Sequence, residues 1–197
     1  MRATIGVAIA AALAFGPSAA SAQGFIAGWV NAGVDYEVNG QEIETGTRNG
    51  FTAGIVFSRA AGMIGFRTEG LYTQKGFTVG SGSNQGELKS AYIDVPVMLA
   101  VDAMIVRAYA GPQFSFRVAC SVSGSDPNLP PPGTDDSCSE EVESFDFGFK
   151  GGVGAKLSIF TIDVVGTMGT KNAAKNNKDT VNVKNQTVAV VLGLSLP

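Results

Sequence analysis

Residues 106–118 read Val-Arg-Ala-Tyr-Ala-Gly-Pro-Gln-Phe-Ser-Phe-Arg-Val, with apolar and polar positions in almost strict alternation. A period of two over this length predicts a β-strand with two unlike faces. One face would carry Phe114 and Phe116, and the other Arg107 and Arg117. Pro112 cannot donate a ladder hydrogen bond, so we expect a bulge or a local gap in pairing there.

Seven other segments show the same alternation. It is clear in residues 64–73, 91–100, 145–157 and 187–196, and less clean in 25–36, 50–58 and 160–168. In the first segment of the chain, the pattern groups Ile26, Val30 and Val34 on the apolar face. Trp29 then falls on the polar face with Asn31. The chain therefore predicts eight strands.

The seven connections between these segments alternate between long and short. The long, polar ones are residues 37–48, 74–87, 119–142 and 170–182, and the tight ones are 59–62, 102–104 and 157–159. An antiparallel barrel that crosses a bacterial outer membrane has long loops on one side and short turns on the other. We therefore predict an all-β fold, an eight-stranded antiparallel up-and-down transmembrane β-barrel.

The apolar face of this barrel should point outward. It is rich in Phe, glycines gather on the polar face, and only 16% of the residues are charged, too few for a water-facing exterior. The polar face would then form an interior network of paired charges, because an unpaired buried charge is costly. An eight-stranded barrel has room for little else. The predicted network is Arg67, Glu69, Asp94, Arg107, Arg117, Asp146, Lys150 and Asp163, with Asp35, Lys156 and Arg117 nearer the rims.

The N-terminus has the features of an export signal. Arg2 is followed by the apolar run 5–15, and Ala20-Ser21-Ala22 has the small-x-small pattern of a cleavage site. We expect a cleaved signal peptide at residues 1–22 and one outer-membrane barrel domain at 23–197. Cys120 and Cys138 are the only cysteines. In an exported protein they most simply form one disulfide, and without His they cannot complete a zinc site.

Several motifs resemble a known family. Residues 69–76 (Glu-Gly-Leu-Tyr-Thr-Gln-Lys-Gly), 92–96 (Tyr-Ile-Asp-Val-Pro), 110–114 (Ala-Gly-Pro-Gln-Phe) and 146–148 (Asp-Phe-Gly) are similar to strands of the small outer-membrane β-barrel domain, often labelled "porin family protein". The resemblance implies an eight-stranded barrel of the OmpA/OmpX type in the bacterial outer membrane. Such barrels usually end in an aromatic residue, whereas this chain ends Leu-Ser-Leu-Pro, which puts the final insertion signal in question.

Composition narrows the function. The chain has no His, which the known outer-membrane lipases and acyltransferases use as a base, and its net charge of −3 disfavours nucleic acid. We predict no catalytic, cofactor-binding or metal site, and a structural or surface-interaction role. The alternatives are a narrow porin and a soluble lipocalin-like barrel with an apolar ligand. Expected partners are membrane lipid and lipopolysaccharide, the barrel-assembly machinery, and an extracellular ligand bound through the loops. Lipopolysaccharide phosphates would meet Lys171, Lys175 and Lys178.

Overall fold

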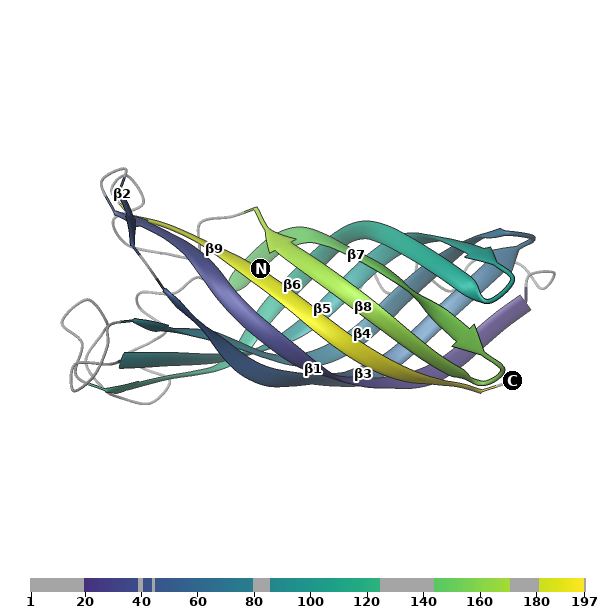
Figure 1. Ribbon diagram of the computed structural model, residues 1–197, viewed down its shortest axis with the longest axis horizontal. Coiled ribbons are helices and arrows are strands. Elements are labelled where there is room, and N and C mark those ends of the chain that lie inside the picture. Colours follow the sequence, from purple (N-terminus) through teal and green to yellow (C-terminus); the bar gives the residue numbers. More distant parts are fainter. Residues whose placement is uncertain are drawn as a thin grey trace, which may run out of the picture.

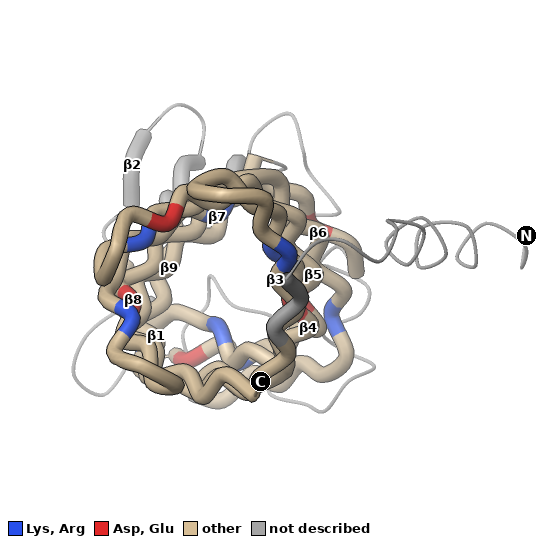
Figure 2. The backbone as a smooth tube through the Cα atoms, turned by 90° about the vertical axis from the view of Figure 1, so that its right-hand side faces the viewer, with Lys and Arg blue, Asp and Glu red and all other residues tan. Residues whose placement is uncertain are grey.

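The protein is a closed antiparallel β-barrel. The computed structural model describes residues 20–38, 41–43, 45–79, 86–124, 144–170 and 181–196. Each long strand pairs with the next, and β9 pairs back onto β1 to close the ring, which Figure 2 shows end-on. The long strands are β1 (Ala20–Val38), β3 (Gly46–Ala61), β4 (Ile64–Val79), β5 (Gly86–Ala103), β6 (Val106–Gly124), β7 (Phe145–Leu157), β8 (Phe160–Gly169) and β9 (Val181–Leu196). The predicted eight-stranded up-and-down barrel is confirmed.

The connections alternate in length as predicted. Two-residue turns at 62–63, 104–105 and 158–159 lie at one end, together with the end of β9 (Figure 1). The longer connections lie at the other end, where the short strand β2 (Gln41–Ile43) pairs with β1 alone among the described residues. The strands reach further than the sequence suggested, since β4, β5 and β6 extend into segments that we expected to be loops. No described residue belongs to a helix long and apolar enough to cross a membrane.

The outer surface is apolar, as the alternation indicated. Outward-facing side chains include Phe66, Leu99, Phe149, Val164 and Leu192, and each is at least 40% exposed. The exception to the predicted assignment is β1, where the two faces are reversed. Its exposed residues include Gln23, Phe25 and Trp29, whereas the aliphatic face with Ile26 and Val30 points inward.

The reversal of β1 has a physical cause. Both faces of this strand are apolar near its start, so period-two alternation alone does not choose between them. Val30 and Ile26 pack inside against aliphatic residues of neighbouring strands, including Val56 and Val191. Trp29 faces outward, and Trp is typical of the membrane–water interface. The prediction that Ile26, Val30 and Val34 face away from the interior is therefore wrong.

Two irregularities shape β6. Its ladder with β5 is interrupted between the pairs Pro96–Gln113 and Leu99–Ala110, so the expected gap occurs at Pro112. Further along, Ala91 pairs with Ala119 but Tyr92 pairs with Arg117, which leaves Val118 as an extra, bulged residue. A bulge reverses the alternation beyond it. Cys120 consequently points into the barrel and is buried.

The predicted cleavage site lies at the beginning of β1. Among the described residues, Ala20–Ala22 pair with β3, opposite Ser58–Ala60, and Gln23 is the first that pairs with both β3 and β9. The signal peptide itself stays a prediction, because residues 1–19 lie outside the described part of the chain.

Candidate functional site

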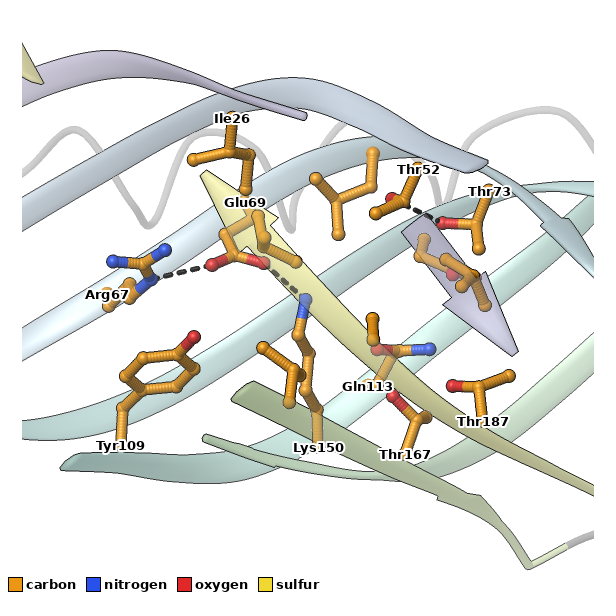
Figure 3. A pocket seen from close by; sticks show the side chains of 16 residues that line it. Ile26, Thr52, Arg67, Glu69, Thr73, Tyr109, Gln113, Lys150, Thr167 and Thr187 are labelled. Carbon is orange, nitrogen blue, oxygen red and sulfur yellow. Dashed lines mark hydrogen bonds and ion pairs between the residues drawn. The ribbon is translucent and has the colours of Figure 1, made fainter. Parts of the chain in front are cut away.

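A cluster of buried ion pairs occupies the centre of the barrel. Arg67 and Glu69 are two residues apart on β4, so both point inward. The Arg67 Nε donates to Glu69 Oε1 at 2.6 Å, and the Lys150 Nζ, from β7, donates to Glu69 Oε2 at 2.5 Å (Figure 3). Asp163 of β8 lies on the other side of Arg67, with Nη2 and Oδ2 3.7 Å apart. One carboxylate therefore joins two cations from strands that are far apart in the sequence.

A second cluster lies nearer the long loops. The Lys75 Nζ donates to Asp94 Oδ1 at 3.0 Å and to Ser115 Oγ at 3.3 Å. The same ammonium lies 4.6 Å from the centre of the Tyr92 ring, a cation–π distance. The two bonds of Lys75 join β4, β5 and β6. On β6 itself, Gln113 Nε2 donates to Ser115 Oγ at 3.1 Å.

The remaining network residues lie toward the two ends. Asp146 is buried and its Oδ2 accepts a hydrogen bond from Asn185 Nδ2 at 2.9 Å. Arg107 is buried beside the turn that joins β5 to β6, with Nε 3.5 Å from Asp102 Oδ1. Arg117 is only half-buried. Seven of the eight predicted network residues are buried, and the central cluster brings together four of them: Arg67, Glu69, Lys150 and Asp163.

Three contributors to the interior are not among the predicted network residues. Lys75 falls in a segment that we expected to be a loop, yet it lies in β4 and is buried. Tyr109 lies on the interior face of β6, and its ring stacks under the Arg67 guanidinium at 4.6 Å. Gly152 lies opposite Tyr109, and a Cβ there would be 2.6 Å from the Tyr109 Cζ. The absent side chain makes room for the ring, a pairing known to stabilise sheets.

Part of the interior is apolar. Ile26, Val30, Val165, Ala189 and Val191 form a continuous wall on β1, β8 and β9. Between this wall and the ion pairs lies a cavity that leaves about 20 Å³ for the centres of water molecules. That is room for roughly one water molecule, which needs 10–15 Å³ by the same measure. The side chains that line this cavity therefore leave little space for water.

Several predictions concern residues outside the described part of the chain. Cys138, Lys171, Lys175 and Lys178 belong to this group, so the disulfide and the lysine cluster stay predictions. Within the described residues, no group of three or more His, Cys, Asp or Glu side chains is placed to hold a metal ion. Lys156 lies exposed at the rim of the turn end.

Comparison with known proteins agrees with this architecture. Residues 5–173 match the family model described as "Outer membrane protein beta-barrel domain". The crystal structure of Neisserial surface protein A (NspA) is similar, with a TM-score of 0.51 and 15% identity over 90% of this chain and 99% of that one. The attachment invasion locus protein Ail of Yersinia pestis has a TM-score of 0.49 and 12% identity, over 89% and 99%. No curated protein matches the chain.

Proposed function

The chain belongs to the outer membrane protein beta-barrel domain family, and on that premise we propose that it is a non-conducting barrel that presents an interaction surface outside the cell. The observation that carries the proposal is the extension of β4, β5 and β6 beyond the lipid-facing band. Family membership places the barrel in a bacterial outer membrane, where the long connections face outward. A catalytic role is not part of the proposal, since the chain has no His.

The extension is paired sheet and has its own small core. On β4, the outward residue Tyr72 is followed by polar Gln74, and the strand continues to Val79. At about 3.3 Å per residue and a tilt of about 40°, the part beyond Tyr72 rises by roughly 18 Å. Phe77 and Leu88 are buried on its inner side, with Val122 from β6. A projecting sheet of this kind offers a rigid surface to a partner.

Charges on the extension suggest what it would meet. Arg48 Nε contacts Glu87 Oε1 at 2.6 Å, and Lys89 Nζ contacts Glu87 Oε2 at 3.1 Å. Two cations share one carboxylate, so the group carries a net positive charge, and Lys89 is exposed to water. Such a group would attract phosphates of lipopolysaccharide. An extracellular ligand bound through the loops, and lipopolysaccharide beside them, are therefore the partners that we propose.

Surface display is tested on intact cells with a membrane-impermeant maleimide. We expect Lys89→Cys to be labelled and the matched control Ile105→Cys, at the turn end, to be protected, with the unmodified chain as the blank. Labelling of both or of neither would contradict the proposed orientation. Binding of purified lipopolysaccharide to vesicle-embedded barrel should then weaken in Lys89→Glu.

The packing of the interior supports a closed barrel rather than an open channel. The central ion pairs and the apolar wall opposite leave about 20 Å³ for water centres, whereas a conducting barrel needs a continuous lumen and usually more strands. We therefore expect no reproducible conductance steps in planar bilayers. Steps of fixed size would favour the narrow-porin alternative. The lipocalin alternative has little support, because the Phe residues face outward and the charges inward.

We also propose the disulfide between Cys120 and Cys138. Cys120 is buried inside the extension, and Ser90 Oγ donates to its Sγ at 3.4 Å. A disulfide here would tie the connection after β6 to the rigid sheet, and a loop of this size gains ~3 kcal/mol in the chain-entropy model. Peptide mapping under non-reducing conditions should find the cross-linked pair. Two alkylated thiols in unreduced, outer-membrane material would contradict it.

A further inference from the structure

The tight-turn end of the barrel is unusually apolar. Each two-residue turn has an aliphatic or Met side chain at its second position: Met63, Ile105 and Ile159. All three are exposed, and Met104, at the first position of its turn, is 98% exposed. Turns that face water normally carry Gly, Asn, Asp or Ser, and here such residues occupy only the first positions of two turns, Gly62 and Ser158. These side chains therefore need an apolar neighbour that the barrel itself does not supply.

The apolar turn residues continue the lipid-facing band without a break. Outward residues next to the turns are also apolar and exposed, including Ile64, Val106, Leu157 and Phe160. The opposite border is sharp, because polar Asn49 and Asn31 lie next to Phe51 and Trp29 on the outward faces of β3 and β1. A comparable polar collar does not occur on the described residues of the three turns.

The height of the band leads to the same conclusion. On β4 the apolar outward surface runs from Tyr72 to Met63, and on β8 it runs from Met168 to Ile159. At about 3.3 Å per residue and a tilt of about 40°, each stretch spans roughly 23 Å along the membrane normal, close to the ~25 Å band of outer-membrane barrels. If the band begins at the aromatic residues of the loop end, it ends at the turns.

The backbone of the turns is also compatible with a hydrocarbon environment. An unsatisfied carbonyl is expensive in hydrocarbon. The carbonyl oxygens of Met63, Ile105 and Ile159 each accept a hydrogen bond from the next hairpin or strand along the ring, at 2.7–2.9 Å. The donors are the backbone N–H groups of Asp102, Lys156 and Ser195. The same hydrogen bond occurs at all three turns. The second turn residue can therefore carry an apolar side chain while its backbone carbonyl is hydrogen-bonded.

Charged side chains near the turns do not oppose this arrangement. Asp102 and Arg107 face each other from the interior side of their hairpin, 3.5 Å apart. Lys156 lies at the rim, and Arg59 holds an outward position on β3. A long basic side chain at a band edge can reach the headgroups while its methylenes stay in the apolar layer.

From these observations we propose that the tight turns are immersed in the acyl chains of the periplasmic leaflet, so the surface formed by Met63, Met104, Ile105 and Ile159 binds phospholipid hydrocarbon. The barrel then has no water-exposed collar on this side. The inference rests on membrane residence and not on the proposed interaction surface at the other end, so either can fail alone.

Depth-dependent fluorescence quenching tests the proposal. The only Trp is removed by Trp29→Phe, and a new Trp is placed by Ile105→Trp or, independently, Ile159→Trp, with Lys89→Trp as the matched control at the loop end. Each full-length variant is folded into phosphatidylcholine vesicles, and folding is verified by the gel shift between boiled and unboiled samples. Using both turns keeps the test decisive if one variant fails to fold.

We expect a blue-shifted emission maximum at either turn, strong quenching when the lipid is replaced by dibrominated phosphatidylcholine, and weak quenching by acrylamide. The Lys89→Trp control should show the reverse. If acrylamide quenches the Trp fluorescence of the turn variants as strongly as that of the Lys89→Trp control, the proposal is overturned. Protection from both quenchers would also overturn it, because it would mean that a second copy of the barrel covers the turns.

Discussion

Replacing Glu69 by Gln should destabilise the folded barrel by ~3–5 kcal/mol. Glu69 is 2% exposed and lies within 3 Å of two cations, the Arg67 Nε at 2.6 Å and the Lys150 Nζ at 2.5 Å. Gln has nearly the same shape, so little packing is lost. The substitution leaves an uncompensated positive charge in a buried site, and breaking a buried pair in this way typically costs about that amount.

The matched control is Glu87→Gln in the extension. Glu87 also contacts two cations at similar distances, but its side chain is 32% exposed. A surface pair is worth only ~0–1 kcal/mol, because water screens it. The two variants therefore remove the same charge from the same kind of contact and differ in burial. Free energies of unfolding are measured by urea titration of vesicle-embedded barrel, with Trp29 fluorescence and heat-modifiable gel migration as two readouts.

A second substitution separates charge from packing. In Glu69→Gln combined with Lys150→Met, the remaining central charges are Arg67 and Asp163, which balance. We expect the double variant to recover part of the loss of the single one, giving a coupling energy that a packing defect would not produce. If Glu69→Gln loses no more stability than Glu87→Gln, or if no coupling is found, the ion pairs are not what holds the interior together.

Further predictions use the same unfolding assay. Gly152→Ala should cost ~1–3 kcal/mol because its Cβ would lie 2.6 Å from the Tyr109 ring, whereas Gly166→Ala, with nothing within 4 Å, should cost little; equal effects would contradict this. Ser158→Gly should gain ~1 kcal/mol because Ser158 has φ of 59°, where L-residues are strained, and a loss of stability would contradict it. Partial burial acts to raise the pKa of Glu87, but hydrogen bonds from the two cations Arg48 and Lys89 lower it below its ordinary value. Its stabilising contribution is therefore present above pH 4.5, its ordinary value, and is lost as the pH falls through the lower folded pKa. Comparison with Glu87→Gln isolates this dependence, which should be absent in the variant.

Much of the architecture could be read from alternation because lipid and a crowded polar interior are such different environments. Residues 145–157 show this most clearly: each Phe faces outward, while Asp146, Gly148 and Lys150 face inward. A slip by one residue would expose every charge to lipid, so the register has one good solution. The same logic located most of the charged network, though not the partners within it.

The pairings could not be predicted because they depend on the shear of the barrel. Glu69 meets Lys150, which is 81 residues away, only when β4 and β7 are both tilted around a common axis. Lys75 was missed for a related reason, since Gln-Lys-Gly resembles loop sequence when its strand partner is unknown. Cys120 turned inward because of the bulge at Val118, and a bulge has no signature in alternation alone.

The misassigned face of β1 explains how this barrel is filled. If every strand placed polar residues inside, eight strands would bring together more charges than could be paired at ~2.6–3.0 Å. Here β1 and β9 contribute aliphatic side chains, and Val165 of β8 joins them. The ion pairs are thereby packed between apolar side chains on one side and their own strands on the other. Such packing excludes water from the salt bridges and strengthens them. A water-filled lumen would weaken the same pairs, so the apolar wall and the closed interior depend on each other.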